Sequence, residues 1–219
     1  RRAGRIPLQH LTGVQEFMGL EFYVNEHVLI PRQDTETLVE LILNEHKEKN
    51  ISLLDVCTGS GCIAISLAKL GGYTDVTALD LSEEALKVAR SNGEKLLDQP
   101  VKFIKSDMFS ALNPEKQYNV IVSNPPYIPS QVIEGLEPEV KDHEPRMALD
   151  GEPDGLKFYR ILAEEGKKYL KNGGSIYMEI GWDQAKDVTE IFEAMGFSGL
   201  RTVRDMAGND RVVCARKEK

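Results

Sequence analysis

One short segment, from Asp55 to Cys62, limits the possible folds of this chain more than any other. It reads Asp-Val-Cys-Thr-Gly-Ser-Gly-Cys, follows an apolar run and leads into a helical pattern. Gly59 and Gly61 permit positive φ angles and a close approach of a ligand to the backbone. A helix that begins there presents free N–H groups and the positive end of its dipole. We therefore predict a strand–loop–helix unit that binds a nucleotide-like ligand at the carboxyl edge of a parallel sheet.

The segments after residue 50 alternate between strand-like and helix-like patterns, which predicts an α/β fold with a mostly parallel sheet covered on both faces. Ser82 is the predicted cap of one helix. The last two strands, joined by residues 207–210, are predicted to form a hairpin that places an antiparallel strand at the sheet edge. The predicted strands cover residues 52–57, 75–80, 101–105, 118–123, 175–180, 200–204 and 210–215, and further predicted helices cover 61–70, 155–170 and 183–195.

Residues 1–33 have a different pattern and are predicted to form a small β-hairpin connector. The stretch 16–25 alternates and is rich in aromatic residues, and 27–31 is a second extended piece, so we expect the two to pair. Asp34 or Thr35 then caps a helix with apolar residues at helical spacing. The predicted organisation is therefore a connector over 1–33 and one main domain over 34–219.

The overall composition narrows the possible partners. The chain carries 27 basic and 35 acidic residues, a net charge of −8, which argues against nucleic acid as the main partner although Arg1–Arg5 forms one basic patch. No run of 18 apolar residues is present, so we expect no membrane helix. The three cysteines, an odd number without a secretory signal, predict a reducing, cytoplasmic location and no metal site. We expect a monomer.

Carboxylates follow two other predicted strands and suggest an adenosine-bearing ligand. Asp80 ends the second strand, where it can accept hydrogen bonds from both ribose hydroxyls. Asp107 follows the third strand and can accept from an adenine amino group, with Met108 or Phe109 packed on the ring. These residues fit NAD as well as S-adenosylmethionine. Asp55, directly before the glycine loop, favours the second, because a carboxylate there suits an amino-acid or sulfonium group better than a pyrophosphate.

The tetrapeptide Asn124-Pro125-Pro126-Tyr127 points to the chemistry. It follows an apolar strand and opens a proline-rich connection, residues 125–154, that is long enough to be an active-site loop. Two prolines remove two N–H donors, so the remaining local polar groups are acceptors suited to an –NH₂ group. Acceptors that hold the two hydrogens of a planar amine can turn its lone pair toward a methyl donor, while Tyr127 stacks on the flat group. The sequence therefore predicts methylation of a planar nitrogen.

At this point the chain resembles the release factor glutamine N5-methyltransferases (PrmC/HemK) over essentially its whole length. The resemblance implies a Rossmann-like class I methyltransferase fold that uses S-adenosylmethionine to methylate the glutamine of the Gly-Gly-Gln motif in class I peptide chain release factors. The motifs that carry it are residues 124–127, 7–13, 16–20, 30–32, Thr35-Glu36, 144–145, 148–149, 154–156, 173–174, 179–181, Gln184, Asp205, Gly208 and 210–213.

The resemblance also assigns roles to individual residues. It implies that Asn124, Pro125 and Tyr127 are catalytic, and that the whole tetrapeptide 124–127, including Pro126, binds the substrate glutamine. The family usually has Gly at position 57 and Pro at position 33, where this chain has Cys57 and Gln33. It also has an N-terminal helical docking domain, which we expect to be missing here. The implied cofactor contacts are Cys57, Thr58, Gly59, Ser60, Gly61, Asp80, Leu81, Asp107, Met108 and Asn124.

Three other interpretations are weaker. An amino-methyltransferase acting on adenine or guanine of DNA or RNA shares the tetrapeptide, but the acidic charge and the lack of a target-recognition domain argue against it. A non-catalytic cofactor-binding subunit would not need an intact Asn124–Tyr127 segment. A NAD-binding protein is the least favoured.

Overall fold

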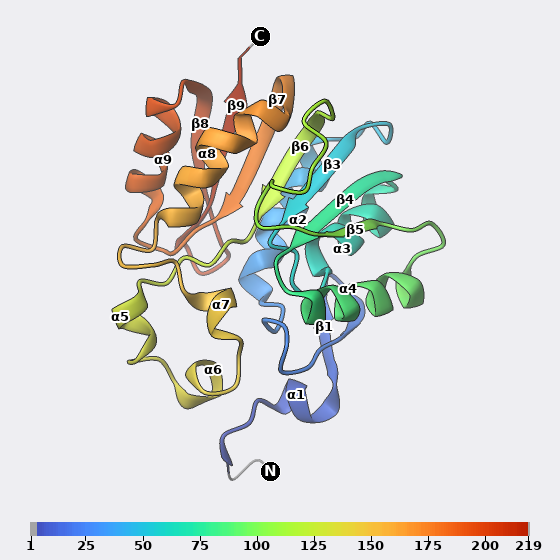
Figure 1. The fold of residues 1–219 in the computed structure, drawn as a ribbon, viewed down its shortest axis with the longest axis vertical. Coiled ribbons are helices and arrows are strands. Elements are labelled where there is room, and N and C mark those ends of the chain that lie inside the picture. The colour runs from blue at the N-terminus through green and yellow to red at the C-terminus, as the bar shows by residue number, and fades with distance from the viewer. Residues whose placement is uncertain (1–3, 219) are drawn as a thin grey trace.

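The apolar strand that precedes the glycine loop lies near the centre of a seven-stranded sheet (Figure 1). The computed structural model describes residues 4–218. Five neighbouring strands run parallel, and β9 runs antiparallel to both of its neighbours. Across the sheet the order is β5 (Lys102–Lys105), β4 (Asp75–Asp80), β3 (Ser52–Val56), β6 (Tyr118–Ser123), β7 (Leu170–Glu179), β9 (Asp210–Lys217) and β8 (Phe197–Arg204).

The predicted α/β architecture is confirmed, with two adjustments. The antiparallel strand β9 lies one place inside the edge, and β8 forms the edge itself. Strand β7 begins at Leu170, five residues before the predicted start at 175, because the turn around Gly173 (φ 76°) interrupts the apolar pattern without ending the strand.

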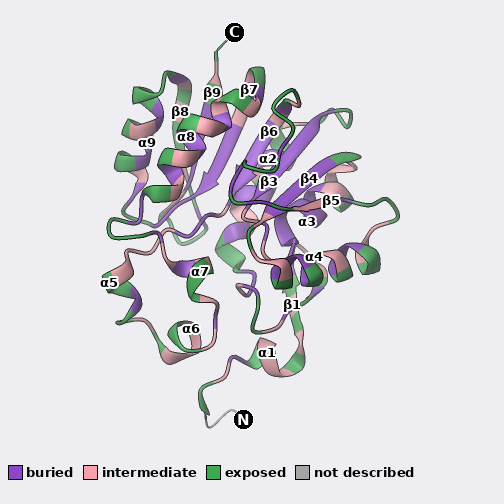
Figure 2. Cartoon of the chain, viewed as in Figure 1, coloured by how far each residue is buried: buried purple, intermediate pink, exposed green. Residues whose placement is uncertain are grey.

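Helices cover the sheet on both faces and divide the core in two. One cluster packs α2 and α3 on side chains such as Leu53 and Val120, and the other packs α8 and α9 on the alternate side chains Leu54 and Ile121. Figure 2 shows the strands buried between helices whose outer faces are exposed. The helices are α2 (Glu36–Glu45), α3 (Cys62–Gly71), α4 (Glu83–Leu96), α8 (Lys157–Tyr169) and α9 (Ala185–Ala194).

Ser82 caps α4 as predicted, since its hydroxyl oxygen accepts a hydrogen bond from the N–H of Ala85 at 3.2 Å. Such a cap stabilises a helix by about 1 kcal/mol. At the start of α2, by contrast, the Thr35 side chain makes no capping bond, and a short 3₁₀ turn (Gln33–Thr35) comes first. The Thr35 hydroxyl is therefore free to act in the site described below.

The predicted pairing of residues 16–25 with 27–31 is wrong. The hairpin begins two residues before the first stretch and pairs β1 (Val14–Phe17) with β2 (Leu20–Tyr23), after a short helix α1 (Leu8–Thr12). Met18 and Gly19, at φ 54° and 72°, form the two-residue turn, a geometry that matches the twist of paired strands.

The hairpin and the segment after it are attached to the main sheet. Phe17 and Phe22 are buried and pack edge to face in the same cluster as α2. The predicted second strand instead runs along the site, where the Ile30 N–H donates to the Glu144 carboxylate at 3.1 Å. The boundary after residue 33 stays a prediction. Of the predicted basic patch, residues 1–3 lie outside the described part, and Arg5 is paired with Glu137 and Glu139.

The proline-rich connection forms three short helices below the carboxyl edge of the sheet (Figure 1). Glu144 fastens it to the rest of the molecule, because this buried carboxylate also binds Arg32 at 2.6 Å. The helices are α5 (Ser130–Ile133), α6 (Pro138–Lys141) and α7 (Arg146–Leu149). Within residues 4–218, no helix has the length and apolar character needed to cross a membrane.

Candidate functional site

The glycine loop between β3 and α3 takes a left-handed path. Cys57, Gly59 and Gly61 have φ angles of 64°, 55° and 82°. The φ angle of Gly61 favours glycine, and an added side chain would also press on Ile65 at 2.9 Å and Ala89 at 3.2 Å. Cys57 adopts a left-handed conformation that costs a non-glycine residue about 1 kcal/mol.

Two acidic residues hold this loop in place. Asp80, at the end of β4, accepts hydrogen bonds from the N–H groups of Gly59 at 2.8 Å and Ser82 at 2.9 Å. Burial raises its pKa, yet each oxygen keeps a lone pair for a ligand. Asp55 lies beneath the loop and accepts the Thr58 hydroxyl at 2.6 Å. Burial raises the pKa of Asp55 to about 7, and it supports the loop instead of facing the cavity.

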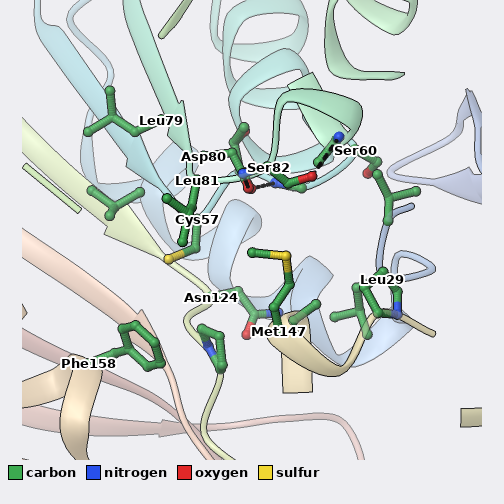
Figure 3. Close-up of a pocket in the computed structure, with 18 of the residues that line it drawn as sticks. Leu29, Cys57, Ser60, Leu79, Asp80, Leu81, Ser82, Asn124, Met147 and Phe158 are labelled. Carbon is green, nitrogen blue, oxygen red and sulfur yellow. Dashed lines mark hydrogen bonds between the residues drawn. The ribbon is translucent and has the colours of Figure 1, made fainter. Parts of the chain in front are cut away.

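Above the loop is a cavity of about 460 Å³ at the carboxyl edge of the parallel strands (Figure 3). All but one of the predicted cofactor contacts line it. The exception is Gly61, whose role is to start α3. Those that line it are Cys57, Thr58, Gly59, Ser60, Asp80, Leu81, Asp107, Met108 and Asn124.

Of the two residues predicted as alternatives for packing on a ring, Met108 or Phe109, only Met108 lines the cavity. Phe109 is buried under the sheet, where it stacks on Tyr169 at 5.2 Å, while Met108 faces the cavity. Phe158, at the start of α8, lines the cavity instead, and the Met147 side chain points into it (Figure 3). Neither residue was singled out in the sequence.

The rest of the cavity wall comes from the stretch before α2, which sequence patterns did not assign to the cavity, and from the proline-rich connection, which was predicted to be an active-site loop. Leu29, Pro31, Arg32 and Thr35 contribute from the stretch before α2, and residues 145–148 contribute from α7 and its start. The Pro31-Arg32 and Thr35-Glu36 motifs were the available signal for the first of these, but they indicated a family and not a position.

A second, smaller cavity of about 110 Å³ lies beside the first. Asn124, Pro125 and Tyr127 line it together with Glu179. Asn124 lines both cavities, as do Leu29, Arg32 and Ala148. Pro126 lines only the larger of the two cavities. The structure therefore places the tetrapeptide at the junction between the two cavities.

Hydrogen bonds to residues outside the tetrapeptide hold its polar side chains in place. The Asn124 amide Nδ2 donates to the Thr35 hydroxyl at 3.4 Å, and the Tyr127 hydroxyl donates to Glu179 Oε1 at 3.4 Å. Burial raises the pKa of the Tyr127 hydroxyl far above its usual value, so the ring stays neutral. Burial also raises the pKa of Glu179 to about 7, although Thr35 and Arg211 oppose this shift.

Within residues 4–218, no three or more His, Cys, Asp or Glu side chains form a group able to hold a metal ion. The junction holds several acceptors, namely the Asn124 side-chain oxygen, the Pro125 carbonyl and the Glu179 carboxylate, and the Arg32 guanidinium beside them is paired with Glu144. Such a site is suited to holding a donor-rich group such as –NH₂.

Comparisons with known proteins agree with this geometry. The family model for the methyltransferase small domain matches residues 33–135. A release factor glutamine methyltransferase of Fusobacterium nucleatum is 45% identical over 99% of this chain, which spans 62% of that protein. The enzyme of the same name from Geobacter sulfurreducens is 43% identical over 99% of this chain, which spans 75% of it.

A solved structure extends the similarity to three dimensions. It is the release factor-specific protein-(glutamine-N5) methyltransferase of Alicyclobacillus acidocaldarius, with a TM-score of 0.53 and 32% identity. The match covers 90% of this chain and 100% of that one.

Proposed function

Because this chain belongs to the family of release factor glutamine methyltransferases, we propose that it methylates the side-chain amide nitrogen of the Gly-Gly-Gln glutamine in a class I release factor, with S-adenosylmethionine as methyl donor. The observation that carries this proposal is the position of Asn124, which lines both cavities at once. A residue placed in this way can contact a methyl donor on one side and a methyl acceptor on the other.

The larger cavity suits an adenosine-bearing methyl donor. Its volume of about 460 Å³ is in the range of small-molecule sites, about 300–1,000 Å³. Asp80 retains acceptor capacity for ribose hydroxyls, and Phe158 and Met108 offer apolar surface for a ring. When bound, S-adenosylmethionine supplies an electrophilic methyl group on its sulfonium.

The smaller cavity suits the acceptor amide. We assign the grip on its two N–H groups to the Asn124 side-chain oxygen and the Pro125 carbonyl, because Pro125 and Pro126 have no competing N–H donors. Tyr127 packs on the flat amide and fixes its plane. This arrangement aligns the nitrogen lone pair with the junction. No strong base is needed beforehand, because the nitrogen becomes acidic only as it gains the methyl group.

The proposal also covers the oligomeric state, the partners and the cellular location of the protein. We expect a monomer that contacts the release factor directly and binds no nucleic acid itself, in line with the net charge of −8. We also propose a location in the reducing cytoplasm, where Cys57, Cys62 and Cys214 would stay as free thiols.

A labelled-methyl assay tests this function against its rival. The protein is incubated with labelled S-adenosylmethionine and a release factor, a release factor with Gln→Ala in the Gly-Gly-Gln motif, or duplex DNA. We expect label only in the unaltered release factor. Label in DNA, or equal label in the Gln→Ala factor, would overturn the proposal.

The first prediction concerns Asn124→Ala. Turnover should fall by at least about 10²-fold, because the acceptor that aligns the amide is lost, whereas cofactor affinity should fall much less. Single-turnover methylation and calorimetric titration with S-adenosylhomocysteine measure the two effects separately. Retained turnover would show that Asn124 does not hold the amide.

A further inference from the structure

A buried carboxylate that the proposed mechanism does not use lies directly behind the tetrapeptide. Glu179 ends β7 and is 2% exposed. Its Oε1 accepts the Tyr127 hydroxyl at 3.4 Å, whereas Oε2 has no hydrogen-bond partner among the described residues. The Thr35 hydroxyl and the Arg211 charge lower the pKa of Glu179 against the larger effect of burial, but Thr35 makes no hydrogen bond to either carboxylate oxygen in the structure. A buried acceptor of this kind requires an explanation.

Thr35 connects this carboxylate to Asn124. Its side chain is buried, and its oxygen accepts a hydrogen bond from Asn124 Nδ2 at 3.4 Å. A hydroxyl group has a single proton to donate, and a carboxylate that is ionised, as Glu179 is above its pKa of about 7, can only accept. If the Thr35 proton points to Glu179, the lone pairs of Thr35 are left for the Asn124 N–H.

We propose that Glu179 is a positioning residue that fixes the direction of a hydrogen-bond chain, from Asn124 Nδ2 to the Thr35 hydroxyl and from that hydroxyl to Glu179. The inference rests on the proposed function and deepens it. The chain determines which end of the Asn124 amide faces the junction of the two cavities.

The direction matters because the two ends of an Asn amide differ in chemistry but hardly in shape. With Nδ2 bound to Thr35, the Asn124 oxygen faces the junction and can accept from a substrate –NH₂. With the chain reversed, Thr35 would donate to the Asn124 oxygen, and the Asn124 –NH₂ would meet the substrate –NH₂. Two donors then face each other, and the grip on the amide is lost.

Glu179 also accepts a hydrogen bond from Tyr127, so it contacts a second residue of the tetrapeptide region. Its two oxygens can accept from Thr35 and Tyr127 together. A glutamine in its place would offer one acceptor oxygen and one –NH₂, so one of these two hydroxyls would have to face a donor. The charge-neutral isostere therefore breaks the chain without changing its shape.

The test compares Glu179→Gln with Thr35→Val and with the double variant. We expect kcat for release factor methylation to fall about 10- to 100-fold in each single variant, with the dissociation constant for S-adenosylhomocysteine within about twofold of the parent. The double variant should be no slower than the slower single variant, because both substitutions interrupt one chain. Thr35→Ser, which keeps the hydroxyl, should retain most of the parent activity.

Glu45→Gln is the matched control, because it replaces a carboxylate that also accepts a tyrosine hydroxyl but lies away from both cavities. It should leave kcat within about twofold. Full activity of Glu179→Gln, or losses that multiply in the double variant, would overturn the inference while leaving the proposed function intact.

Inactivity of the parent itself toward the release factor would instead contradict the proposed function. In that case, thermal unfolding of the same variants decides the inference. A Tm change in the double variant that differs from the sum of the two single changes supports the chain, and Tm changes that add refute it.

Discussion

Two tyrosine–carboxylate pairs lie near opposite ends of α2 and behave in opposite ways. At its carboxyl end, Tyr177 donates to Glu45 at 2.8 Å, and Arg201 also binds that carboxylate. Near its amino end, Tyr127 donates to Glu179 at 3.4 Å. Tyr177 and Glu179 are two residues apart on β7 and so lie on the same face. The chemistry of the two pairs is the same, and only their surroundings differ.

Those surroundings shift the pKa values of the two carboxylates in opposite directions. Burial alone would raise the pKa of Glu45, but hydrogen bonds from Arg201 and Tyr177 outweigh it and the net shift is downward. Glu179 is deeper, and burial raises its pKa to about 7. The first pair therefore stabilises the fold, while the second holds a carboxylate that the fold disfavours, as is common at functional sites.

The largest expected effect is a pH-dependent stability difference for Glu179→Gln. The folded pKa of Glu179, about 7, exceeds the ordinary value of 4.5, so folding retains a proton between these values and stability falls as the pH rises through that window. The change is at most about 3 kcal/mol. Between pH 4.5 and 8 the variant should gain this much relative to the parent. The groups facing Glu179 are Asp34, Thr35, Cys62, Tyr127, Tyr159 and Arg211.

Urea unfolding of parent and variant at pH 4.5, 6 and 8 measures the difference directly. Contributions from Asp55 are common to both proteins and cancel. Glu45→Gln should show the opposite sign, because its lowered pKa contributes stability at neutral pH that is lost as the pH falls. Parallel stability curves for the parent and Glu179→Gln would mean that the two carboxylates do not differ as described.

A smaller effect should separate the two tyrosines. Tyr127→Phe should lower turnover about tenfold with little loss of stability, because the ring remains but its hydroxyl no longer ties it to Glu179. Tyr177→Phe should cost about 1 kcal/mol of stability, since it removes a hydrogen bond to a charged partner, and leave turnover within about twofold. Chemical unfolding and methyl transfer are measured on both variants. The same ranking of the two variants in both measurements would contradict this separation.

The smallest effect is expected for Arg201→Ala. Arg201 and Glu45 have side chains that are 47% and 30% exposed, so their ion pair is partly screened by solvent. The loss in unfolding free energy should be below about 1 kcal/mol and should shrink further in 1 M salt. Unfolding in low and high salt tests this, and a larger, salt-independent loss would mean that the Glu45 pair is as isolated from water as the Glu179 pair.

The sequence predicted local features well and long-range ones poorly. Ser82 capping and strands 75–80 and 118–123 were correct because each depends on a few neighbouring residues. The hairpin was misassigned because its turn, Met18-Gly19, lacks the usual Asn-Gly or Asp-Gly signal.

The same distinction applies to the site. Residues of the glycine loop and the tetrapeptide are contiguous in sequence and were found. Thr35, Glu179 and Phe158 reach the cavities through the packing of distant elements, which no local pattern encodes. The sequence left Met108 and Phe109 as alternatives because neighbouring residues there differ between burial in the core and exposure to the cavity.

The position of β9 has a consequence for how the site forms during synthesis. Glu179 is paired in register with Val212, and Ile180 donates its N–H to the Arg211 carbonyl at 2.9 Å. Strand β7 therefore lacks its second neighbour until residues 210–217 have been made, although the tetrapeptide leaves the ribosome about 85 residues earlier by the sequence numbering. A nascent chain can complete the glycine loop early, but the carboxylate behind Asn124 acquires its final surroundings only when this late strand has inserted.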